Sequence, residues 1–83
     1  MSLQSFQIFV INLSGKTLTI EVTRETTIKE LKAKILDRVG VSFNDVYLIH
    51  QSKPLSNDEC TIQDYNIQAN TQIFMIARLK GGN

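Results

Sequence analysis

The C-terminal tail of the chain holds the residues with the clearest chemical potential. Gly81 and Gly82 follow residues 72–78, an alternating stretch that is typical of a buried strand. Because the two glycines carry no side chains and have the widest choice of backbone angles, such a tail could be threaded into a narrow enzyme channel. On composition alone, the same diglycine could also begin a linker. The first interpretation makes the rest of the chain a small globular handle for the tail.

Two other reactive residues, Cys60 and His50, are the only cysteine and histidine of the sequence. Cys60 has no neighbouring histidine or lysine that would activate its thiol, so we expect an inert thiol in a loop. His50 has no second histidine or cysteine beside it, which favours a packing or surface role over catalysis or metal binding. A phosphate-binding loop, a paired-cysteine metal motif and a nucleophile with an identifiable base are all missing. We therefore expect no enzyme activity, no bound metal and no cofactor.

The composition is that of one small soluble domain. The 83 residues leave no room for a second domain. Nine basic and eight acidic residues give a net charge of +1, which argues against a nucleic-acid or membrane binder driven by bulk charge. No apolar run approaches the ~20 residues of a membrane span, and the N-terminus lacks the pattern of a signal peptide. We expect a monomer in the cytoplasm, the nucleus or both.

The first third of the sequence predicts a β-hairpin. Residues 6–13 and 16–22 are rich in strand-forming side chains, and Ser14 and Gly15 suit the tight turn between them. The second strand alternates between apolar and polar residues, so one of its faces is solvated. The first strand has a second apolar face, made of Phe9, Ile11 and Leu13. Either this strand is buried on both sides or its outer face is a binding surface.

The rest of the pattern adds one helix and three more strands. Thr27 and Glu30 have the spacing of a capping box, and Gly40 suits the left-handed end of the helix that they begin. A strand is expected at residues 46–50, a brief edge strand from Leu55 after Pro54, and a last strand from residue 72. This order predicts an α+β fold in which a twisted mixed sheet packs on a single helix.

These elements, and the residues that fill them, closely resemble the ubiquitin family over residues 6–82. The matching segments are Gln7-Ile8-Phe9-Val10, Gly15-Lys16-Thr17, Glu21-Val22, Thr27-Ile28, Lys32-Ala33-Lys34-Ile35, Leu48-Ile49, Asp64-Tyr65-Asn66-Ile67-Gln68, Arg78-Leu79 and Gly81-Gly82. The resemblance implies the β-grasp fold, a mixed five-stranded sheet on one helix, with the last strand between the first and the third. Residues 1–5 would be a flexible N-terminal extension, residues 6–79 the β-grasp domain, and residues 80–83 a flexible diglycine tail with one residue beyond it.

The resemblance also implies a protein modifier whose tail is the reacting end. Many family members are joined through a C-terminal glycine to target lysines, which makes Gly82 the conjugated residue and Gly81 its neighbour in the enzyme channel. Arg78 and Leu79 match the segment that the activating enzyme recognises. Asn83 lies beyond the diglycine, so a processing protease would have to remove it. The implied partners are this protease and ubiquitin-type activating and conjugating enzymes.

A docking face for ubiquitin-binding domains is implied in the same way. The residues that match the apolar patch of ubiquitin are Leu13, Ile49, Phe74 and Ile76. Phe74 stands where ubiquitin has a histidine, which makes the patch larger and more apolar. Phe9 and Ile11 match a smaller neighbouring surface, and ubiquitin has a lysine at the position of Ile11.

Four lysines match positions at which ubiquitin itself accepts further copies. They are Lys53, Lys16, Lys34 and Lys32. Tyr47 departs from the family pattern, because it replaces an arginine near the activation surface.

Two alternatives share the same fold. The chain could be a non-conjugated ubiquitin-like docking domain of a larger or fusion protein, in which the patch binds partners and the diglycine is incidental. It could instead be a sulfur carrier, whose terminal glycine becomes a thiocarboxylate. The dense match to ubiquitin favours the modifier and the docking domain over the carrier.

Overall fold

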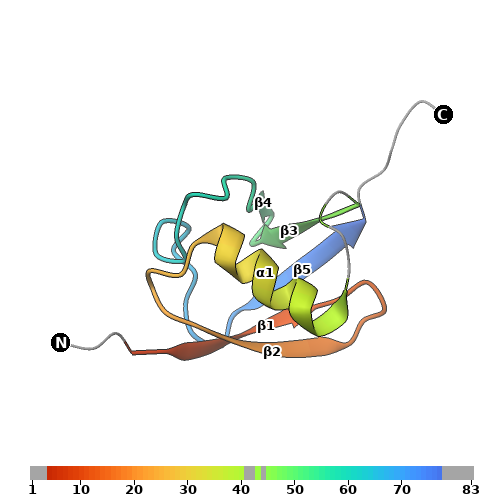
Figure 1. The fold of residues 1–83 in the computed structure, drawn as a ribbon, viewed down its shortest axis with the longest axis horizontal. Helices are drawn as coiled ribbons and strands as arrows, with labels where there is room; N and C mark the ends of the chain where they lie inside the picture. Colours follow the sequence, from red (N-terminus) through yellow and green to blue (C-terminus); the bar gives the residue numbers. More distant parts are fainter. Residues whose placement is uncertain (1–3, 41–42, 44, 78–83) are drawn as a thin grey trace.

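One sheet and one helix make up the part of the chain that the structure describes. The computed structural model describes residues 4–40, 43 and 45–77. The elements are β1 (Phe6–Ile11), β2 (Thr17–Val22), α1 (Ile28–Val39), β3 (Val46–His50), β4 (Lys53–Pro54) and β5 (Gln72–Ala77). The five strands form one sheet in the order β2-β1-β5-β3-β4 (Figure 1). The predicted position of the last strand, between the first and the third, is confirmed.

The sheet is mixed because its central strand comes from the end of the chain. β5 runs parallel to β1 and antiparallel to β3. The β1–β2 hairpin and the short β3–β4 hairpin, both antiparallel, complete the two sides of the sheet. The first and last strands therefore lie side by side, and the sheet is complete only when the two ends of the chain have met.

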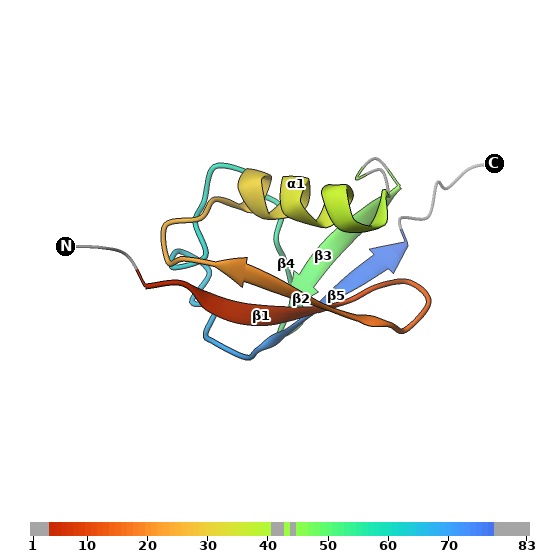
Figure 2. The ribbon, with the colours of Figure 1, turned by 60° about the horizontal axis from the view of Figure 1, so that its bottom comes forward.

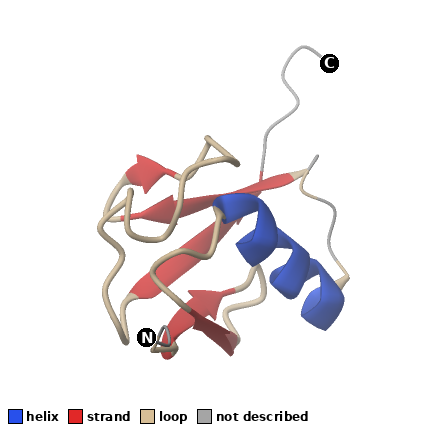
Figure 3. Cartoon of the chain, turned by 60° about the vertical axis from the view of Figure 1, so that its left-hand side comes forward, coloured by secondary structure: helices blue, strands red, loops and turns tan. Residues whose placement is uncertain are grey.

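The helix covers one face of this sheet. Figures 2 and 3 show α1 lying against one side of the strands. The apolar residues between the helix and the sheet are nearly inaccessible to solvent: Ile8, Val10, Ile20, Val22, Ile28, Leu31, Ile35, Val46, Leu48, Leu55, Ile62, Ile67, Ile73 and Met75. Each strand contributes alternate residues to this core, as its period of two requires. Among the described residues no helix covers the opposite face of the sheet.

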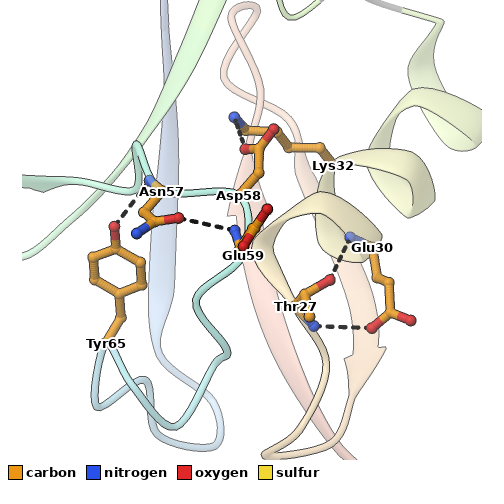
Figure 4. A network of polar contacts seen from close by, with 7 residues as sticks. All are labelled: Thr27, Glu30, Lys32, Asn57, Asp58, Glu59 and Tyr65. Carbon is orange, nitrogen blue, oxygen red and sulfur yellow. Dashed lines mark hydrogen bonds and ion pairs between the residues drawn. The ribbon is translucent and has the colours of Figure 1, made fainter.

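Both ends of α1 are closed as the sequence predicts. The Thr27 side chain accepts a hydrogen bond from the Glu30 amide at 3.1 Å, and the Glu30 carboxylate accepts one from the Thr27 amide at 2.9 Å (Figure 4). Gly40 ends the helix with φ of 71° and donates its amide proton to the Leu36 carbonyl. Arg38, in the last turn, donates to the Thr19 carbonyl at 3.1 Å and so ties the helix to β2.

A loop from the second half of the chain packs against the start of the helix. The Lys29 amide donates to the Asp58 carbonyl at 3.0 Å. The Lys32 ammonium contacts the Asp58 carboxylate at 2.7 Å, and the Asn57 amide donates to the Tyr65 hydroxyl at 3.1 Å (Figure 4). These contacts fix the loop, although its sequence is polar and lacks a regular pattern.

The end of β1 differs from the prediction. The predicted strand continues to Leu13, whereas β1 ends at Ile11. The cause is Asn12, whose side-chain oxygen accepts hydrogen bonds from the amides of Ser14 and Lys16, both at 3.0 Å. A side-chain oxygen of asparagine often replaces a backbone acceptor in this way and starts a turn.

The fourth strand also begins earlier than predicted. Gln51 and Ser52 form the whole turn after β3, with φ of 52° and 69°. A two-residue turn of this kind sets the register of the hairpin, so Lys53 pairs with His50 and the strand is Lys53–Pro54. Leu55, the predicted first residue of the strand, instead follows it and is buried.

The capping box gives a first testable prediction. Thr27→Ala removes the acceptor for the Glu30 amide, so we expect the free energy of unfolding to fall by about 1 kcal/mol. For a domain of this size, the melting temperature should fall by about 4–8 °C. Thermal unfolding followed by circular dichroism measures both. Lys29→Ala, an exposed change in the same turn, is the control and should have a much smaller effect; equal effects would show that the cap contributes nothing.

Candidate functional site

The outer face of the sheet, opposite the helix, is built by the residues that alternate with the core. In β5, Ile73 and Met75 point into the core, so Phe74 and Ile76 point outward. Phe74 has 42% of its surface exposed, which is unusual for so large an apolar side chain. Ile76 is half-buried. The strand that completes the core therefore also carries the centre of the predicted patch.

The register of β3 and β5 brings three of the four predicted patch residues together. Ile49 is the direct cross-strand partner of Phe74. Ile76 pairs with Tyr47, two residues from Ile49 on the same face. Side chains of direct partners on one face lie within contact distance. Leu13, the fourth residue, is 53% exposed in the hairpin turn beyond the end of β1, and the strand register gives it no partner among the other three.

The secondary patch is continuous with this surface. Ile11 is the partner of Phe74 across the parallel β1–β5 pair, and Phe9 is the partner of Gln72. Both Phe9 and Ile11 are half-buried. The second apolar face of the first strand is therefore explained by the outer surface of the sheet, since no described element covers it.

Two further residues belong to the same face, although the sequence analysis did not assign them to it as binding residues. Tyr47 is half-buried beside Ile76. Pro54 is exposed and pairs with Ile49 in the short β3–β4 hairpin. Alternation with Val46 and Leu48 could have placed Tyr47 on this face, but the position of Pro54 depends on the length of the turn.

The outer face is almost without charge. Glu21 is the only charged residue among the outward-facing positions of the five strands, and its carboxylate accepts a hydrogen bond from the Ser5 hydroxyl at 2.8 Å. The other outward-facing residues are Gln7, Phe9, Ile11, Thr17, Thr19, Tyr47, Ile49, Pro54, Gln72, Phe74 and Ile76. An apolar, uncharged surface of this kind is typical of a protein-binding site.

The predicted reacting end lies outside the described residues. β5 ends at Ala77, and the residues assigned to activation, conjugation and processing follow it: Arg78, Leu79, Gly81, Gly82 and Asn83. Met1 to Leu3 of the predicted N-terminal extension also lie outside. The roles of these residues therefore stay predictions.

The predicted acceptor lysines differ in their surroundings. Lys16, Lys34 and Lys53 are exposed. The side chain of Lys32 is only 21% exposed; its ammonium lies 2.7 Å from the Asp58 carboxylate and 5.7 Å from the centre of the Phe43 ring. Lys32 is therefore the least accessible of the four amines.

This difference can be measured with a small acylating reagent. Limited acetylation should modify Lys32 more slowly than Lys34, because Asp58 and Phe43 cover its amine. Asp58→Ala should raise the rate at Lys32 and leave the rate at Lys34, the internal control, unchanged. Peptide mass spectrometry at several reaction times gives both rates. Equal rates in the unsubstituted chain would contradict this account.

His50 is a packing residue, one of the two roles that the sequence predicts for it. It is 5% exposed at the end of β3, where its Nε2 atom lies 3.3 Å from the Thr71 hydroxyl. Lys53, its partner in the β3–β4 hairpin, is the charged residue paired with it. Burial lowers the pKa of His50 below its ordinary value of 6.5. The folded protein thus favours the neutral imidazole.

The lowered pKa makes stability depend on pH in a known direction. Because the unfolded chain binds a proton at His50 more readily, the stabilisation is complete above pH 6.5 and is lost as the pH falls below 6.5 and through the lowered pKa. His50 is the only histidine, and most carboxylates titrate below about pH 5. Urea unfolding between about pH 7.5 and 5 should show this loss, and His50→Phe should abolish it. A profile shared by both proteins would assign the dependence to other groups.

The remaining reactive groups suggest no second site. Cys60 is a half-buried free thiol. Within residues 4–40, 43 and 45–77, no three histidine, cysteine, aspartate or glutamate residues lie close enough together to hold a metal ion. In the same ranges, no helix is long and apolar enough to cross a membrane.

Comparison with known proteins agrees with the fold and the position of the outer face. Residues 8–80 match the ubiquitin family. The chain is also 26% identical over 71 residues to the NEDD8-like protein RUB1 of Saccharomyces cerevisiae, a match that covers 86% of this chain and 91% of that relative. The matched range includes α1 and every described strand except the first two residues of β1. The chain belongs to the ubiquitin family.

Proposed function

We propose that this protein is a ubiquitin-like modifier in precursor form. Its Gly82 is joined to target lysines after Asn83 is removed, and its partners recognise the apolar outer face of the sheet. The match to the ubiquitin family over residues 8–80 is the observation that carries this proposal. The protein acts as a substrate and label, with no catalysis of its own.

The chemistry of the tail follows from the sequence. The carboxyl group of Gly82 is held in a peptide bond to Asn83, so hydrolysis must free it before it can react. An activating enzyme then adenylates the carboxylate with ATP and transfers the glycyl group to a cysteine thiol. A conjugating enzyme receives it and passes it to a lysine amine. Gly81 and Gly82 suit this route, because side chains at either position would obstruct a narrow channel.

The outer face supports the second half of the proposal. Ile49, Phe74 and Ile76 come together on two neighbouring strands, and the face around them carries almost no charge. Because the core is complete without them, their apolar surface is free to bind ubiquitin-binding domains of other proteins. We include in the proposal a location in the cytoplasm, the nucleus or both, where such enzymes and receptors would act on it.

Covalent activation is the test of this function. The chain ending at Gly82 is incubated with ATP and an extract of the cells that express it, and its intact mass is measured without reducing agent. We expect a thioester adduct that hydroxylamine cleaves. Gly82→Ala should abolish the adduct, and the chain that still carries Asn83 should form it only after losing that residue. Absence of any ATP-dependent adduct would reject the modifier.

The alternative function, a non-conjugated docking domain, rests on the same outer face. It would be favoured if no adduct forms while purified ubiquitin-binding domains still bind the chain and Ile49→Ala abolishes that binding. A terminus that gains the mass of one sulfur in place of one oxygen would instead indicate a sulfur carrier. These outcomes separate the three functions, because each concerns a different bond or surface.

A further inference from the structure

Four apolar residues form a row that crosses four strands of the outer face. In order across the sheet they are Ile11 in β1, Phe74 in β5, Ile49 in β3 and Pro54 in β4, and each is the direct register partner of the next. We refer to them as the cross-sheet row. We propose that this row binds a single amphipathic helix of a partner protein, lying across the strands. The proposal adds the kind of partner to the docking function proposed above.

The row joins two surfaces that the sequence suggested were separate. Ile49 and Phe74 belong to the predicted patch, and Ile11 belongs to the secondary patch. Since Ile11 and Phe74 are register partners, no polar residue separates the two. One ligand can therefore cover both.

The dimensions of the row match those of a short helix. Neighbouring strands lie about 4.8 Å apart, so four strands span about 14 Å. One turn of an α-helix rises 5.4 Å, close to one strand spacing, so a helix laid across the strands can place about one side chain on each strand. At 1.5 Å per residue, the row accommodates about 10 residues, or roughly three turns.

The width of the apolar surface favours a helix over a second sheet. Along the strands, only Ile76 and Tyr47 add a further apolar level, about 7 Å from the row. On the other side of the row β5 has Gln72, and the outward residues of β2 are polar throughout. A narrow strip of this kind suits a helix about 10 Å in diameter, whereas sheet-on-sheet packing, as in a dimer through this face, requires apolar residues along both directions.

The absence of charge sets the chemistry of the ligand. None of the four side chains of the row is charged, and Glu21 lies at the opposite end of the outer face. The bound face of the helix should therefore carry aliphatic or aromatic residues once per turn, at i, i+4, i+7 and i+11. A buried charge on that face would lose its hydration without a partner, which is costly.

The test uses a synthetic helical peptide of about 16 residues, with leucine at i, i+4, i+7 and i+11 and neutral polar residues elsewhere. Its control has the same composition with the leucines distributed around the helix. Binding to the isotope-labelled full chain is followed by NMR and fluorescence anisotropy. We expect shifts in β1, β5, β3 and β4 along the row with the patterned peptide only. Ile11→Lys should weaken binding by about tenfold or more, while Ile11→Val should retain it.

Gln7→Lys is the matched control, because it places the same charge on the same strand and face, away from the row. Thermal unfolding of each variant establishes that it is folded. Three results would overturn the proposal: equal binding of both peptides, loss of binding in Ile49→Ala but not in Ile11→Lys, or a dimer of the free chain that Ile11→Lys dissociates. Adduct formation is measured separately on the unsubstituted chain, so failure of the row and failure of the modifier function are distinguishable.

Discussion

The parallel pairing of β1 with β5 is the interaction on which the rest of the structure depends. It places the last strand of the chain in the centre of the sheet, between β1 and β3. Ile73 and Met75 then complete the core under the helix. Every outward residue of β5 is fixed by the same register, so the core and the outer face are two consequences of one strand. A change that displaces β5 would disturb both.

A single helix can cover only one face of a five-stranded sheet. The α1 helix, closed by its capping box and by Gly40, buries the inner residues of the strands. The loop that carries Asp58 is tied to the same helix, which leaves Lys32 poorly accessible while other lysines stay exposed. The outer face gains nothing from this packing, so its apolar residues have no structural need that the core would explain. Their retention on a small domain is consistent with selection for binding.

Much of this architecture is predictable from local sequence. The capping residues Thr27 and Gly40, the alternating strands and the central last strand are confirmed, the last through resemblance to the ubiquitin family. The contact between Ile11 and Phe74 required the structure, because residues so far apart in sequence are joined by tertiary register and not by local pattern. The same holds for the ion pair of Lys32. The start of β4 was predicted wrongly because a two-residue turn, invisible to periodicity, sets its register.

The central claim is that the chain becomes covalently attached to other proteins. The most direct measurement is made in cells: the chain with an N-terminal tag is purified under denaturing conditions, digested with trypsin, and searched for lysines that carry a Gly-Gly remnant. Cleavage after Lys80 would leave Gly81 and Gly82 on each acceptor. The account predicts such lysines in proteins other than this chain, and their loss in Gly82→Ala. Recovery of the unmodified chain alone, with no remnant on any other protein, would contradict it.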